Sequence, residues 1–160
     1  MKTLIIHHLQ PIWEKGLNRY GTSFEEQMQL VCEHSENNQY NQVILTNFES
    51  WEIEPEQYPI TQFCFPAIET YDYGWCFDGL DITEEQKEKI EQGKIIECDY
   101  NNKWALGGQH SEVVYIPEWM ENLKGEIYIC GVFDGECIED LETALNTLEI
   151  DFNRINELIV

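Results

Sequence analysis

Basic residues are scarce in this 160-residue chain, which has nine lysines and arginines against 31 aspartates and glutamates. The formal net charge of −22 at pH 7 should repel phosphate backbones and anionic lipid surfaces. Direct binding to nucleic acid or to a membrane surface is therefore not expected. Three interpretations of the acidity stay open: solubility or adaptation to a salty cytoplasm, a docking surface for a basic protein partner, and mimicry of a nucleic acid toward a DNA-binding protein.

The chain also lacks the usual patterns for metal binding and for membrane insertion. None of its six cysteines stands in Cys-x-x-Cys spacing, which leaves a zinc ribbon or a thioredoxin-type site unsupported. No apolar run approaches the roughly 18 residues of a membrane span, and the apolar start around Leu4–Ile6 is far too short for a signal peptide. We expect a cytoplasmic protein with reduced thiols, no metal and no cofactor.

The length and the hydrophobic content of 42% indicate one packed domain over residues 1–160, because both are ordinary for a globular protein with a single core. Buried strands are predicted by apolar runs, and amphipathic helices by apolar residues at helical spacing. Two strand–helix–strand units result, which implies parallel strands and a three-layer α/β sandwich with a mostly parallel central sheet. The predicted strands of these units lie at 3–9, 42–46, 126–132 and 155–160. The first predicted helix starts within 22–26 and fades over 34–38, and the second spans 137–148.

Elements outside these two units are predicted by weaker signals. The first helix can begin with a capping box of Thr22 with Glu25 or of Ser23 with Glu26. Residues 49–73 contain three prolines and are interpreted as irregular, with a candidate short strand at 61–65. Further predictions are a polar helix at 83–93, a strand at 95–98 and a short helix at 117–123.

The turn between the strand at 126–132 and the last helix carries the sharpest chemical signal. It delivers Cys137 to the first turn of a helix, where the dipole and free N–H groups favour a thiolate and can stabilise an oxyanion. Carboxylates at Asp134, Glu136, Glu139 and Asp140 oppose this, because nearby negative charge disfavours ionisation of a thiol. A nucleophilic role and a purely structural role of Cys137 both stay open.

The same turn resembles the isochorismatase/nicotinamidase family of cysteine hydrolases. In that family a strand is followed by Gly-Val and then by the nucleophilic cysteine six residues after the glycine. The residues that match this frame are Gly131, Val132, Cys137 and Ile138. The first strand also looks like the family's opening, where Asp-x-Gln is followed three residues later by an aromatic residue, here Gln10 and Trp13.

The chain departs from the family at three places. His8 occupies the position of the catalytic aspartate, and Asn47 to Ser50 stand where the family has an Asp-x-His metal pair. The nearest lysine to the family's catalytic lysine is Lys103. The resemblance implies Cys137 as nucleophile, His8 as the orienting acid or base and Lys103 as a cation that favours the thiolate, with substrate contacts from Gln10, Trp13 and Phe133.

Because His7 and His8 are neighbours in a predicted strand, we expect their side chains to point to opposite faces of the sheet. Three functions follow for the whole chain. It is a divergent cysteine hydrolase of a small amide-type substrate, a catalytically inactive relative, or an acidic protein-binding or inhibitor domain that docks on a basic partner and can mimic a nucleic acid. The oligomeric state, a homo-oligomer included, is left open.

Overall fold

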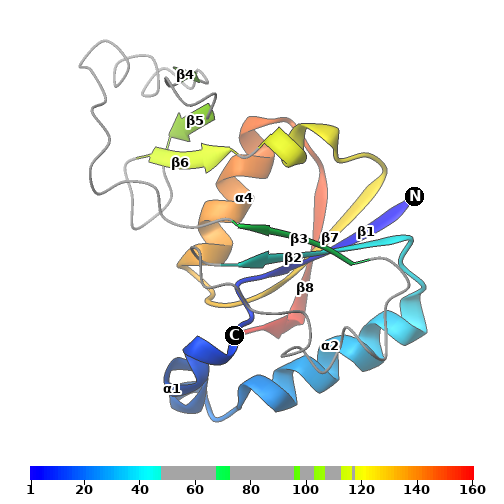
Figure 1. Cartoon of the computed structure of the whole chain (residues 1–160), viewed down its shortest axis with the longest axis vertical. Helices are drawn as coiled ribbons and strands as arrows, with labels where there is room; N and C mark the ends of the chain where they lie inside the picture. Colours follow the sequence, from blue (N-terminus) through cyan, green and yellow to red (C-terminus); the bar gives the residue numbers. More distant parts are fainter. Residues whose placement is uncertain (48–67, 73–95, 98–102, 107–112, 117) are drawn as a thin grey trace.

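A computed structural model describes residues 1–47, 68–72, 96–97, 103–106, 113–116 and 118–160 of the chain. Its centre is a five-stranded sheet in which every neighbouring pair of strands is parallel (Figure 1). The expected α/β class with a mostly parallel sheet is therefore confirmed. The strands of this sheet are β1 (Lys2–His7), β2 (Gln42–Asn47), β3 (Ile68–Asp72), β7 (Glu126–Gly131) and β8 (Phe152–Ile159).

The strand order in this sheet is β3-β2-β1-β7-β8. The chain adds strands on one side of β1 and later returns to add β7 and β8 on the other side. The connections that leave β1 and β7 run to opposite faces of the sheet, which opens a crevice at the carboxyl ends of these two neighbours. Such a crevice is where open parallel sheets bind their ligands.

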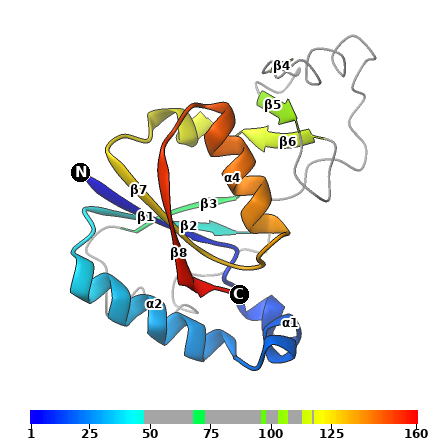
Figure 2. The same ribbon diagram turned by 180° about the vertical axis from the view of Figure 1, so that it is seen from behind.

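Helices cover both faces of the sheet, as Figures 1 and 2 show from opposite sides. Alternate residues of β1 point to different cores: Leu4 and Ile6 join the cluster beneath α2 (Phe24–Asn38), whereas Ile5 joins the cluster beneath α4 (Cys137–Thr147). This alternation is the period of a β-strand that is buried on both faces. All three residues are at most 1% exposed, so the centre of β1 is the middle of the molecule.

Helix α2 begins as the sequence indicates. Ser23 is its N-cap, with the Ser23 hydroxyl accepting from the backbone N–H of Glu26 and the Glu26 carboxylate accepting from the backbone N–H of Ser23. Of the two capping boxes considered, the structure has the Ser23–Glu26 box. The short segments between β1 and α2 were not expected: they are η1 (Pro11–Trp13), α1 (Glu14–Leu17) and η2 (Asn18–Tyr20).

The second strand–helix–strand unit, β7–α4–β8, is confirmed. Apolar residues of α4 share one buried stripe, which packs on the sheet together with Met120 of the short 3-10 helix η5 (Glu118–Asn122). Strand β8 starts at Phe152, three residues before the predicted start, and is an edge strand of the sheet. The buried stripe consists of Cys137, Ile138, Leu141, Ala144 and Leu145.

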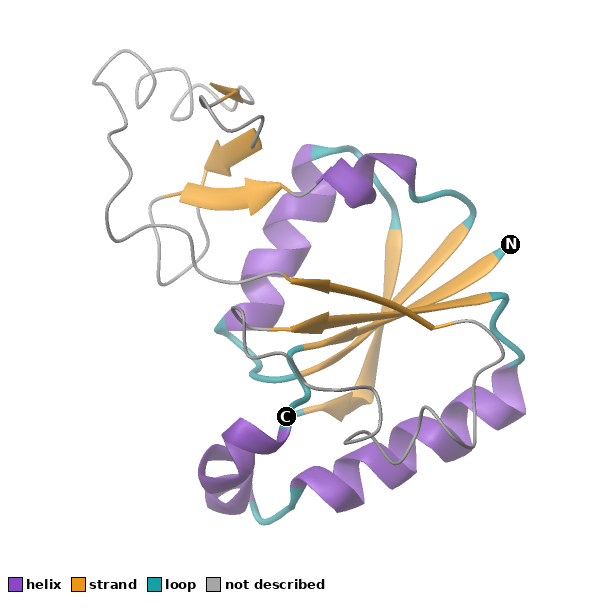
Figure 3. Cartoon of the chain, in the orientation of Figure 1, coloured by secondary structure: helices purple, strands orange, loops and turns teal. Residues whose placement is uncertain are grey.

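A second, three-stranded antiparallel sheet has the order β4-β5-β6 and lies against α4 (Figure 3). The predicted strand at 95–98 corresponds to β4, but the other two strands were not expected. The interpretation of 49–73 as irregular is wrong for β3, whose sequence Ile-Glu-Thr-Tyr-Asp offers no apolar run to reveal an edge strand. The strands of the second sheet are β4 (Ile96–Glu97), β5 (Lys103–Leu106) and β6 (Val113–Ile116).

Two of the predicted elements, the strand at 61–65 and the helix at 83–93, lie outside the described residues. Among the helices that are described, none is both long enough and apolar enough to cross a bilayer.

Candidate functional site

The candidate site lies in the crevice at the carboxyl ends of β1 and β7. Cys137 is the first residue of α4, six residues after the end of β7, so the predicted strand-to-helix junction is confirmed. The backbone N–H groups of Glu136 and Ile138 both donate to the carbonyl of Phe133, at 3.1 and 3.2 Å, which fixes the tight turn before the cysteine. Cys137 itself is only 5% exposed.

Gly131 brings the two central strands into close contact at this edge. Its φ of +131° is a conformation that residues with a side chain rarely adopt, and an added Cβ would lie 2.0 Å from the carbonyl oxygen of His7. The neighbouring N–H of Val132 donates to that same carbonyl at 3.0 Å. A glycine is therefore required for β7 to leave the sheet beside the end of β1.

The two histidines at the end of β1 lie on the same side, contrary to the expectation. The strand ends at His7, and His8 has a left-handed backbone with φ of +53°, so the alternation of a strand does not extend to His8. The two rings stack with centroids 3.7 Å apart. Both side chains are buried, with exposed fractions of 0% and 2%.

Thr46 at the end of β2 fixes this histidine pair. Its hydroxyl oxygen lies 2.7 Å from Nδ1 of His7 and accepts from the backbone N–H of His8 at 3.3 Å. Burial lowers the pKa of His7 well below 6.5, the neighbouring His8 lowers it further, and a polar contact with the backbone of Cys137 acts in the opposite direction. His7 is therefore a neutral imidazole at pH 7, close to the junction that carries the thiol.

A pocket of about 410 Å³ opens beside this junction. It lies between the segment that follows β1 and the β7–α4 turn, the two connections that diverge from the crevice. Two of the predicted substrate contacts, Trp13 and Phe133, line it, whereas Gln10 is fully buried and is not part of the wall. The lining consists of Ile12, Trp13, Lys15, Gly16, Arg19, Tyr20, Phe133 and Glu136.

Aromatic rings make up much of this wall. The Phe133 ring packs edge-on against Trp13, with centroids 5.8 Å apart, and stacks on Tyr20 at 5.7 Å. Gly16 makes room for the ring, since a Cβ at that position would come within 2.5 Å of the Phe133 ring. Cys137 follows the lining residue Glu136 in sequence but does not itself line the pocket.

Lys103 lies on a different sheet from the strands that lead to the other predicted catalytic residues. Lys103 is the first residue of β5, where it pairs with Glu97 and Ile116 in the second sheet, whereas His8 and Cys137 follow β1 and β7 of the central sheet. Its role as a cation beside the thiol stays a prediction.

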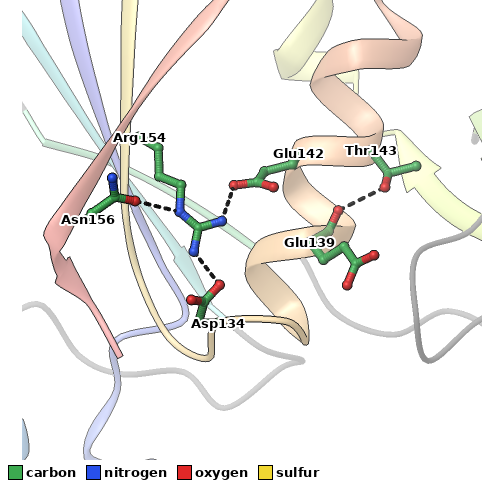
Figure 4. A network of polar contacts seen from close by, with 6 residues as sticks. All are labelled: Asp134, Glu139, Glu142, Thr143, Arg154 and Asn156. Carbon is green, nitrogen blue, oxygen red and sulfur yellow. Dashed lines mark hydrogen bonds and ion pairs between the residues drawn. The ribbon is translucent and has the colours of Figure 1, made fainter.

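Arg154 of the edge strand β8 contacts the turn that precedes Cys137 (Figure 4). Arg154 of β8 pairs with Asp134 of the turn and, at 2.9 Å, with Glu142 of α4, while its Nε donates to Asn156 at 2.9 Å. One cation thus joins the edge strand, the turn and the helix that together position the thiol.

Arg154→Gln is expected to lower the free energy of unfolding by about 1 kcal/mol, because the ion pairs it removes are partly exposed and screened by solvent. Urea unfolding followed by far-UV circular dichroism measures the change. The matched control is Arg19→Gln, since Arg19 makes no ion pair within the described part of the chain. Equal stability of the two variants would show that the Arg154 network does not hold the turn.

Within the described ranges, no group of three or more His, Cys, Asp or Glu side chains is arranged to hold a metal ion. Comparisons of the chain with protein-family models, with curated proteins and with solved structures found no match.

Several residues of the site were not singled out from the sequence. Thr46 stands within a predicted strand, and Lys15, Arg19 and Tyr20 lie between the predicted elements, where the sequence gives no periodic pattern. One signal was available for the two cations: Lys15 and Arg19 are four residues apart, which places them on one face of any helical segment. Nothing in the sequence pattern pointed to Thr46 as the partner of His7.

Proposed function

We propose that this chain is a divergent, isochorismatase-like cysteine hydrolase of a small amide-type molecule, with Cys137 as the nucleophile. The observation that carries the proposal is the position of Cys137, which opens α4 directly after β7, at the edge of a parallel sheet where β1 and β7 diverge. A thiol at the N-terminus of an 11-residue helix meets a favourable dipole.

The neighbouring groups are consistent with this chemistry. His7 is held as a neutral imidazole by burial beside its stacked neighbour His8, and its polar contact with the backbone of Cys137 helps to position the residue that carries the thiol. The pocket next to the turn supplies a binding wall for a small molecule. In the proposed reaction the thiolate attacks the carbonyl carbon, the leaving amine takes a proton, and water then hydrolyses the thioester to free the carboxylic acid and the thiol.

Acyl transfer to Cys137 is tested with p-nitrophenyl acetate. The thiolate forms a bond to the acetyl carbon, p-nitrophenolate leaves, and water later cleaves the acetyl thioester. The proposal expects a rapid release of about one p-nitrophenolate per chain, which Cys137→Ser abolishes and Cys32→Ser leaves intact. An unchanged burst in the Cys137→Ser protein would contradict the assignment.

Thiol labelling against pH gives a second readout. Iodoacetamide should modify Cys137 with a midpoint below the value of about 8.5 of a free thiol. Cys32, half-buried on α2, is the internal comparison, while burial raises the pKa of the Cys130 thiol and should leave Cys130 unmodified. A midpoint for Cys137 at or above that of Cys32 would favour a structural thiol.

A second candidate function is a non-catalytic binding protein of the same fold. It is favoured by the burial of Cys137, which is 5% exposed and lies outside the pocket wall. In this form the chain would dock on a basic protein partner through its excess of acidic residues, with a salt-dependent affinity. Absence of an acyl burst together with salt-sensitive binding of a basic protein would favour this second function.

A further inference from the structure

The pocket beside the β7–α4 turn concentrates positive charge in a chain that has few basic residues. Two of the nine lysines and arginines, Lys15 and Arg19, line this one pocket. Both residues are exposed, and neither forms an ion pair with a carboxylate in the described part of the chain. Arg154, in contrast, forms ion pairs with Asp134 and Glu142. Two free cations at one pocket therefore form a local site for an anion.

Much of the pocket lining is apolar and consists of aromatic rings. Tyr20 and Ile12 are 62% and 40% exposed, which makes them two of the four large apolar residues exposed in the described chain. The Tyr20 and Phe133 rings are stacked on each other, and Trp13 packs edge-on against Phe133. Such walls favour a planar ring, since aromatic faces stack with offset geometry.

The charges at the pocket set the charge of the ligand. Lys15 and Arg19 face a single carboxylate of the lining, Glu136, which leaves a local charge of +1. A monoanion balances this charge, whereas a phosphate carrying nearly two negative charges would leave an excess in the field of a chain of charge −22. The guanidinium of Arg19 matches the two oxygens of a carboxylate.

We propose, on the basis of the proposed function, that this pocket takes a monoanionic ring carboxylate, with the ring against Phe133 and Tyr20 and the carboxylate at Lys15 and Arg19. The volume of about 410 Å³ is at the lower end of the roughly 300–1,000 Å³ of typical ligand pockets, which suits one or two fused rings. The substrate class is thus narrowed from small amides in general to those that also carry a ring-bound carboxylate.

The experiment is calorimetric titration of the Cys137→Ser chain, which cannot turn over, with 1-naphthoate, 1-naphthamide and phenyl phosphate. We expect 1-naphthoate to bind at least tenfold more tightly than the other two probes. Lys15→Gln and Arg19→Gln should each weaken 1-naphthoate about threefold to fivefold, as for exposed ion pairs, and leave 1-naphthamide unchanged.

Lys124→Gln is the matched control, because it removes one positive charge from an exposed position just before β7, at the opposite end of that strand. Equal binding of naphthoate and naphthamide, tighter binding of phenyl phosphate, or equal weakening by Lys124→Gln would each overturn the inference. The outcome is independent of the thiol tests. Carboxylate preference without an acyl burst would overturn only the hydrolase, and a burst without carboxylate preference would overturn only this inference.

Discussion

Gly131→Ala is expected to lower the free energy of unfolding by about 3–5 kcal/mol. The added Cβ would lie 2.0 Å from the carbonyl oxygen and 2.8 Å from the nitrogen of His7. Those atoms belong to β1, the central strand, which is paired on both sides and cannot move away. Overpacking of this kind costs about 1–3 kcal/mol, and the unfavourable φ of +131° adds a further ~1–3 kcal/mol.

Gly21→Ala is the matched control for this prediction. Gly21 also has a positive φ, +78°, but no atom lies within 4 Å of its ideal Cβ position. It should therefore carry the backbone strain alone, about 1–2 kcal/mol. Urea unfolding of the two variants and the parent chain measures the difference. Failure of Gly131→Ala to fold while Gly21→Ala folds agrees with the prediction, and equal destabilisation of the two would contradict it.

The stability of the chain should fall as the pH is lowered from 6.5 to 5, in part because of His7. Burial and the adjacent His8 lower the pKa of His7 in the folded state, whereas the unfolded chain has a histidine pKa near 6.5. Below pH 6.5 the unfolded state therefore binds the proton more readily, and the contribution of His7 to stability, complete above pH 6.5, is lost at up to about 1.4 kcal/mol per pH unit. Over this window the loss has an upper limit of about 2 kcal/mol.

The His7→Gln variant isolates this contribution. Glutamine is neutral and can still hydrogen-bond the Thr46 hydroxyl, so its absolute stability is lower but its pH dependence no longer includes an imidazole at this position. The carboxylates titrate equally in both proteins and cancel in the comparison. Urea unfolding at half-unit pH steps should give a shallower slope for His7→Gln between pH 6.5 and 5. Parallel slopes would show that His7 is not held neutral by the fold.

The central sheet was predictable because its inner strands are buried on both faces. Burial of this kind produces continuous apolar runs such as Leu4-Ile5-Ile6 and Val43-Ile44-Leu45, and the helix at 137–148 has its apolar residues on a single stripe. Strand β3 could not be predicted from an apolar run, because it lies at the edge of the sheet and its sequence mixes polar and apolar residues. The β5–β6 pair consists of four-residue strands, too short for a periodic pattern to stand out.

The site was predictable only in part. The position of Cys137 followed from the order of strand, turn and helix, and Trp13 and Phe133 were named as contacts of a pocket that both line. The stacking of His7 on His8 depends on one residue leaving the strand conformation, and periodicity carries no information on where a strand ends. The partnership of Thr46 with His7 depends on strand pairing across 39 residues of sequence.

Because the two cores lie on opposite faces of the sheet, the pocket wall and the helix that begins with Cys137 rest on separate sets of side chains. The pocket-lining segment 12–20 packs with the α2 side, through Leu17 and Trp13, whereas the helix that presents Cys137 rests on the α4 side through Ile138 and Leu141. Substitutions that reshape ligand preference can accumulate in the first connection without disturbing the support of the thiol. An engineer could therefore randomise the exposed positions among 12–20 as a specificity library while keeping the α4 core fixed.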